Sequence, residues 1–133
     1  MKLFTGMALG VVAGIGIGAA AVQSLHAQAT PPVYYVAEID ASDPKAYAKE
    51  YVPKAQTLIK AAGGRYVASG GTGSSGKLVG FDGEPPKSRV VIIMWDSMEQ
   101  IQAWHSSPEY QEGRKTGDQH AKFRSFAVDS LPQ

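Results

Sequence analysis

The segment RVVIIMW, residues 89–95, constrains the fold of this chain more than any other stretch. Every residue after Arg89 is apolar, and an unbroken apolar run of this length is typical of a β-strand that is covered on both faces. The segment therefore predicts a central strand of a sheet. The rest of the structure has to supply a cover for each side of that sheet.

Three further segments are rich in β-branched and aromatic residues and predict strands: 33–39, 65–69 and 124–129. Residues 77–81 (KLVGF) are also expected to be extended. In the first strand the alternation places Val33, Tyr35, Ala37 and Ile39 on one face and Glu38 on the other.

The first helix is predicted between Asp43, which can cap its free amides, and the pair Gly63-Gly64, where glycine accepts a left-handed end. Pro53 lies inside this helix and removes one backbone hydrogen bond, which predicts a kink.

A second helix is predicted to begin at Ser97, because Ser97 and Gln100 form a capping box. Ser107 followed by Pro108 predicts the start of a short third helix.

The resulting order is β-α-β-β-α-β, with an extra helical segment before the last strand, which is the ferredoxin-like pattern of the α+β class. It predicts an antiparallel sheet with both main helices on one face. The strands are too apolar for the other face to stay wet, so we expect a second copy of the chain to cover it and form a homodimer.

The first 29 residues differ from the rest. Lys2 precedes an uncharged run, residues 3–25, and Ala27 and Ala29 supply the A-x-A pattern of a secretory cleavage site. The expectation is a signal peptide over residues 1–29, cut after Ala29 or after Ala27, and a periplasmic or secreted single domain over residues 30–133. An uncleaved N-terminal membrane anchor is the alternative, because the run is about long enough to span a bilayer.

Charge argues against two classes of partner. Lys2 is the only charged residue before Thr30, so the chain beyond the signal carries 12 basic and 12 acidic side chains. A balanced chain has no electrostatic footprint for nucleic acid or for an anionic membrane surface. The chain has no cysteine, so an exported domain has to rely on its core, and dimerisation would bury additional apolar surface.

Two glycine motifs suggest nucleotide binding and fail on context. Gly71, Gly76 and Lys77 satisfy G-x-x-x-x-G-K, but Leu78 follows the lysine where a magnesium-binding Ser or Thr belongs, and no helix can begin there. The G-x-G-x-x-A pattern of residues 14–19 lies within the export signal, without a strand before it. We interpret the first as a hairpin loop and dismiss the second.

Five residues are candidates for a ligand pocket: Glu38, Arg65, Arg89, His105 and Tyr110. The two arginines stand at strand starts and could hold a ligand carboxylate or serve as surface charges. His105 could be a general acid or base or a helix-terminal histidine, and Tyr110 could equally be core or rim packing. No nucleophile–base couple and no histidine pair with metal-ligand spacing stands out, so the sequence predicts no cofactor and no metal.

The chain resembles the DUF1330 family of unknown function through motifs along most of residues 33–129. They are Asp43-Pro44-Lys45-Ala46-Tyr47, Ala62-Gly63-Gly64-Arg65-Tyr66, Asp82-Gly83 before Pro85, Arg89-Val90-Val91-Ile92, Ala103-Trp104, Ser107-Pro108-Glu109-Tyr110 and Arg124-Ser125-Phe126. The family is similar to the dimeric α+β barrel superfamily. The resemblance implies a ferredoxin-like fold and a dimer whose joined sheets enclose small cavities, and it implies no reaction.

Three functions stay open at this point. The leading hypothesis is an exported dimer that binds a small, partly apolar molecule. The runner-up is a cofactor-independent enzyme of the oxygenase or isomerase type, in which His105 or an arginine polarises the substrate. The third is a structural homodimer without a ligand.

Overall fold

A computed structural model describes residues 30–133, so the expected signal peptide and the glycine pattern of residues 14–19 lie outside the described residues. The elements of the described part, in chain order, are β1 (Val33–Ala41), α2 (Pro44–Ala46), the π-helical turn η1 (Tyr47–Tyr51), α3 (Val52–Ala62), β2 (Arg65–Gly71), β3 (Arg89–Trp95), α4 (Met98–Ser106), α5 (Pro108–His120) and β4 (Ala121–Asp129).

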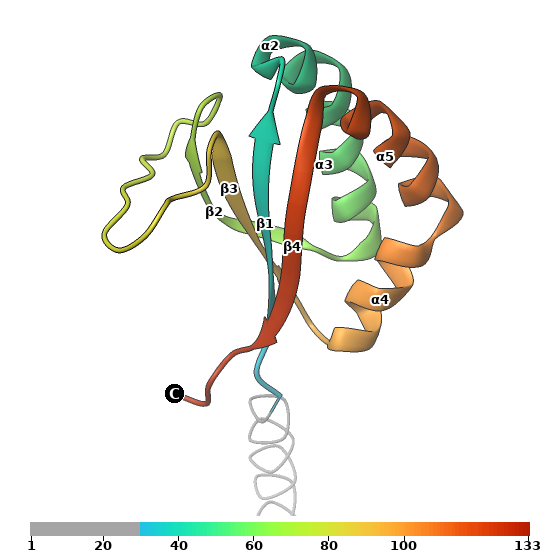
Figure 1. Ribbon diagram of the computed structural model, residues 1–133. Helices are drawn as coiled ribbons and strands as arrows, with labels where there is room; N and C mark the ends of the chain where they lie inside the picture. The colour runs from blue at the N-terminus through green and yellow to red at the C-terminus, as the bar shows by residue number, and fades with distance from the viewer. Residues whose placement is uncertain (1–29) are drawn as a thin grey trace, which may run out of the picture. The chain divides into compact units, whose positions relative to one another are not determined.

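The four strands form one sheet in the order β2-β3-β1-β4, and every neighbouring pair is antiparallel. The helices α3, α4 and α5 all lie on the same side of this sheet (Figure 1). This arrangement is the ferredoxin-like, α+β fold that the element order predicts.

Strand β3 is an interior strand, as its apolar sequence predicts, with β1 on one side and β2 on the other. Its side chains alternate between two environments. Those that point toward the helices are buried: Val91, Ile93 and Trp95. Those on the opposite side, the open face of the sheet, are half-buried: Val90, Ile92 and Met94. The loop between β2 and β3 lies over one end of the open face, where the Lys77 carbonyl approaches Gly70 and Lys87 lies 4.0 Å from Asp40. No helix covers this face (Figure 1).

The first helix is interrupted ahead of Pro53, where the sequence predicts a kink. The interruption is η1, in which the backbone N–H of Val52 bonds to the carbonyl of Tyr47, five residues earlier. Pro53 has no N–H to donate to the preceding turn, and a π-helical turn accommodates this missing hydrogen bond. At the other end Gly63 adopts φ 102° and closes the helix, as expected.

Helix α5 is longer than the sequence suggests. It covers 13 residues rather than a short turn, and β4 begins at Ala121 rather than at Arg124. The helix lies close to η1 because Gly117 carries no side chain. A Cβ atom there would come within 3.0 Å of the Tyr51 ring. The sequence predicts this helix poorly, because it contains two glycines, which are unfavourable in helices, and many polar residues.

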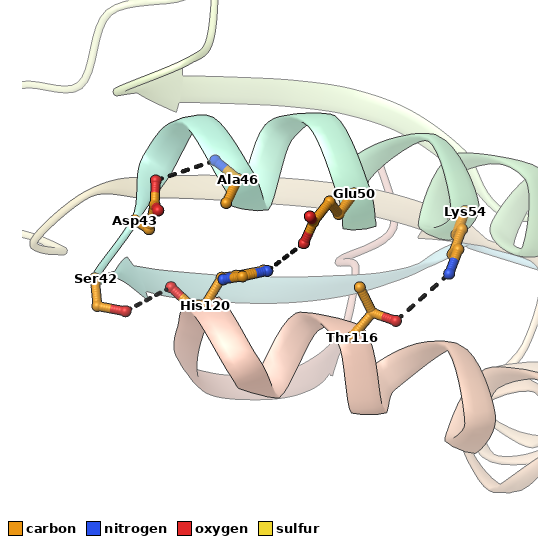
Figure 2. Close-up of polar contacts among 7 residues, drawn as sticks. All are labelled: Ser42, Asp43, Ala46, Glu50, Lys54, Thr116 and His120. Atoms are coloured by element: carbon orange, nitrogen blue, oxygen red, sulfur yellow. Dashed lines mark hydrogen bonds and ion pairs between the residues drawn. The ribbon is translucent and has the colours of Figure 1, made fainter.

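The C-terminal half of α5 is tied to the first helix by polar contacts (Figure 2). The His120 imidazole pairs with the Glu50 carboxylate, and Lys54 Nζ donates to Thr116 Oγ1 at 3.5 Å. The carbonyl of His120 accepts from both the backbone N–H and the hydroxyl of Ser42, at 2.8 and 3.0 Å. The two bonds from Ser42 join the residue after β1 to the last residue of α5, directly before β4.

The segment between β2 and β3 is an irregular loop. Residues 77–81, expected to be extended, contain no strand, and no helix follows Lys77, as the rejection of a phosphate-binding loop requires. The loop turns back on itself through a bond from the Gly71 N–H to the Gly76 carbonyl at 3.2 Å. Part of it projects from the sheet (Figure 1), and the Phe81 side chain is 91% exposed.

Candidate functional site

A cavity of about 50 Å³ lies between the helices and the sheet. Strands β1 and β3 form its floor, α3 and α5 its walls, and the exposed side chain of Gln56 stands at its edge. Its lining residues are Tyr35, Ala37, Ile39, Tyr47, Val52, Ala55, Gln56, Ile59, Tyr66, Arg89, Val91, Ile93, Trp104, Tyr110 and Phe123. A space of this size admits a few water molecules, so a larger guest requires side chains to move.

Aromatic rings pack at tilted or edge-on angles around one end of the cavity. The rings of Trp104 and Tyr110 lie 4.4 Å apart between centroids, and Tyr35 meets Trp104 edge-on at 5.1 Å. Trp95 packs against Trp104 with ring centroids 5.0 Å apart. Such a cluster presents apolar surface with few polar groups.

Arg89 provides the positive charge of the cavity. It lies opposite Ile39 across the β1–β3 pair, so its side chain belongs to the helix-covered face rather than the open face. Its Nε is buried without a hydrogen-bond partner, and one terminal nitrogen contacts the Ser69 hydroxyl at a long 3.5 Å. Among residues 30–133 no carboxylate lies within 4.0 Å of it.

Two phenols of the cavity lie within the field of Arg89. Burial raises the pKa of Tyr66 to about 12, although Arg89 acts to lower it. Burial likewise raises the pKa of Tyr47 well above its ordinary value, again against the influence of Arg89. Both hydroxyls therefore keep their protons at neutral pH and act as hydrogen-bond donors rather than as bases.

His105 stands beside the cavity rather than in its lining. Its ring lies 5.0 Å from that of Tyr110 and 6.4 Å from that of Tyr35. Partial burial, and then the positive charge of Arg114, lower its pKa below the usual value. The imidazole is accordingly neutral at pH 7 and able to accept a proton.

Residues 32–131 match the family described as "Domain of unknown function (DUF1330)". The chain belongs to this family. No curated protein matches the sequence.

Solved structures resemble the chain in fold. SnoaB, a cofactor-independent oxygenase from Streptomyces nogalater, is 12% identical with a TM-score of 0.56, over 77% of this chain and 96% of that one. The methylated RPA0582 protein of Rhodopseudomonas palustris is 16% identical with a TM-score of 0.57, over 76% and 82%. A dimeric ferredoxin-like protein of unknown function from Bacteroides fragilis is 12% identical with a TM-score of 0.51, over 74% and 94%. At such low sequence identity, the comparison shows a shared fold and nothing about function.

The DUF1330 domain brings three of the five sequence candidates together. Arg89 and Tyr110 line the cavity, and His105 packs against Tyr110. Tyr110 also accepts a hydrogen bond through its hydroxyl from Arg114, at 3.0 Å. Arg114 in turn lies 3.8 Å over the Phe123 ring, so this side of the cavity is held by an ordered cation–π contact.

The other two candidates lie elsewhere. Glu38 is on the open face, where its carboxylate lies 3.4 Å from Arg124 of β4. Arg65 is an exposed residue at the start of β2, 3.6 Å from Asp96. Each has a partner of opposite charge outside the cavity, so neither shares a site with Arg89.

The sequence did not single out Tyr66, Tyr35, Trp104 or Gln56 as pocket residues. Tyr66 alternates with Arg65 along β2, which was a usable signal for its facing the helices, but a bulge after Tyr66 shifts the rest of that strand. Gln56 carried no signal, because a polar residue on an exposed helix position is ordinary.

Two further properties concern residues 30–133 only. No group of three or more His, Cys, Asp or Glu side chains there is arranged to hold a metal ion. None of the helices in this part is long and apolar enough to cross a bilayer.

Proposed function

We propose that this DUF1330 protein is an exported homodimer that binds a small, partly apolar molecule in the cavity between helices and sheet. One observation carries the proposal: the cavity is walled by aromatic rings, yet two of its lining residues carry a buried donor, Arg89 Nε and Trp104 Nε1, that has no hydrogen-bond partner. Buried donors without partners are uncommon in folded proteins. An acceptor atom on a bound molecule would satisfy these donors, and a water molecule would do so when the cavity holds no such molecule.

The dimer is supported by the open face. Apolar side chains follow one another across it in register: Met94, Tyr34 and Val128 in one row, and Ile92, Val36 and Phe126 in the next. Phe126 and Val128 are 47% and 52% exposed. A contiguous apolar surface of this kind marks an association site, and a second copy packed sheet to sheet would cover it.

Export is supported by the sequence alone. The uncharged run after Lys2 and the A-x-A pattern ending at Ala29 favour a periplasmic or secreted protein. Mass determination of the protein from the exported fraction checks this, since cleavage predicts a chain that begins at Thr30 or Gln28. A chain that keeps Met1 and sediments with membranes would favour the anchor.

A cofactor-independent enzyme is the second candidate. The neutral imidazole of His105, packed on Tyr110 at the edge of the cavity, is suited to accept a proton from a bound substrate. SnoaB, which shares the fold, is such an oxygenase. In this reading Arg89 would stabilise the charge that the proton transfer leaves behind.

Native mass spectrometry of protein purified from the exported fraction tests the proposal. A small molecule that is retained in the gas phase and released by denaturation is expected. Persistently empty protein would favour a purely structural homodimer. Turnover of any molecule found, compared between wild type, His105→Ala and Arg89→Ala, separates a binder from an enzyme.

A further inference from the structure

The lining of the cavity carries a positive charge and no negative charge. Arg89 is the one charged residue among those that line it, and the lining contains no aspartate or glutamate. The other arginine nearby, Arg114, is engaged by Asp118 at 2.9 Å and by the Tyr110 hydroxyl. Arg89 is therefore a cation at an apolar cavity for which residues 30–133 provide no counter-charge.

This arrangement leaves one donor of the half-buried Arg89 without a partner. A guanidinium N–H that leaves water needs an acceptor in exchange. Arg89 has the Ser69 hydroxyl at 3.5 Å, and its Nε has no partner. The phenols of Tyr47 and Tyr66 do not neutralise it, because burial raises their pKa values and keeps them protonated.

The same phenols would assist an anion. A protonated hydroxyl donates a hydrogen bond, and both phenols line the cavity that Arg89 lines. A guanidinium offers donors in a planar fork that matches a carboxylate. Trp104 and Ile93 provide apolar surface elsewhere in the same lining.

The geometry points to a small organic carboxylate as the guest: a single negative charge held by Arg89 and a short apolar or single-ring body against Trp104. This inference rests on the proposed function and assigns its ligand class. The cavity volume of about 50 Å³ limits the body to a small one, with Gln56 and the other rim side chains moving aside to admit it. An inorganic anion would leave the apolar wall unused, and a neutral molecule would leave Arg89 unpaired.

The test uses benzoate and butyrate as probes, benzamide as the neutral counterpart of benzoate, and inorganic phosphate as the anion without an apolar body. Binding to protein purified from cells that express the full chain is measured by calorimetry and by the ¹H–¹⁵N signal of the Arg89 Nε–H. We expect benzoate or butyrate to bind and to shift that signal. Benzamide and phosphate should bind at least tenfold more weakly.

Arg89→Gln is the test variant, and Arg65→Gln is its matched control. Both replace an arginine at the first position of a strand, but Arg65 lies outside the cavity. Arg89→Gln should weaken the carboxylate at least tenfold, which corresponds to about 1.4 kcal/mol, while Arg65→Gln should leave it unchanged. The Nε–H signal of the wild-type protein decides the question even if Arg89→Gln folds poorly.

Several results would overturn the inference. The inference fails if neither carboxylate binds, or if benzamide and benzoate bind with equal affinity. It also fails if the Arg89 Nε–H signal does not move when a carboxylate binds. Equal benzamide binding would remove the anion class and leave the small-molecule binder standing. An empty cavity in native mass spectrometry together with no binding of any probe would remove both.

Discussion

The two faces of the sheet carry similar side chains and have different surroundings. Ile92 and Ile93 are neighbours on β3, yet Ile93 is 1% exposed under the helices and Ile92 is half-buried on the open face. Strand β1 alternates in the same way, with Tyr35 buried and Tyr34 half-buried. The unbroken apolar sequence of β3 therefore describes a sheet with two apolar faces, of which a single chain covers one completely and the other only at one end.

The faces also differ in how they use charge. On the helix-covered face Arg89 stands without a carboxylate beside an aromatic cavity. On the open face Glu38 and Arg124 are paired, and Arg124 has 80% of its side chain exposed. A paired, exposed charge contributes little to stability, whereas an unpaired one at a cavity is the kind of group that a ligand stabilises.

The largest expected effect compares the two isoleucines. Ile93→Ala should lower the free energy of unfolding by about 2–5 kcal/mol, because it removes fully packed side-chain volume. Ile92→Ala should cost well under half of that in dilute solution, where the open face is wet. Urea unfolding at low protein concentration measures both. Equal costs would mean that something within the chain covers the open face, and the comparison would fail.

The next effect concerns association. Ile92→Lys places a charge in the middle of the open face and should weaken a sheet-to-sheet dimer at least tenfold, or about 1.4 kcal/mol. Gln102→Lys adds the same charge on the exposed side of α4 and should leave the dimer intact. Light scattering over a concentration series gives the masses. A wild-type protein that is monomeric at high concentration would rule out the dimer itself.

The smallest effect is a pH dependence on the helix side. The pKa of His105 is lower in the folded chain than in the unfolded one, so the unfolded state binds more protons as the pH falls below about 6.5. Stability that is fully present above that pH should therefore decrease as the pH drops toward the folded pKa, and then level off.

His105→Gln should make the urea midpoint of unfolding less dependent on pH in this window. The difference between variant and wild type isolates His105 from the other histidines. Parallel curves for the two proteins would show that the pKa of His105 is the same in the folded and the unfolded chain.

Much of the fold follows from local chemistry in the sequence. Asp43 accepts a hydrogen bond from the Ala46 N–H at 3.1 Å, and Ser97 accepts one from Gln100 at the same distance, so both helix starts lie where their capping residues predict. The sequence predicts too short a helix α5, because its packing depends on the contact of Gly117 with Tyr51, which is distant in sequence.

The site was less predictable, and the two arginines show why. Arg65 and Arg89 both begin strands and look alike in the sequence. Their faces are decided by register: Arg65 lies opposite Met94, on the open face, while Arg89 lies opposite Ile39, under the helices. Because β3 is apolar on both faces, its alternation does not reveal which residues point toward the helices. Only the pairing of the strands does.

The π-helical turn ahead of Pro53 has a consequence for the wall of the cavity. Tyr47, Tyr51, Ala55 and Ile59 are all buried and recur every fourth residue. In a regular α-helix such a series would wind around the axis by about 120° from first to last, because a turn takes 3.6 residues. The wider turn absorbs much of that drift. One wide turn next to a proline therefore lets Tyr47 and Ile59, twelve positions apart, line the same cavity.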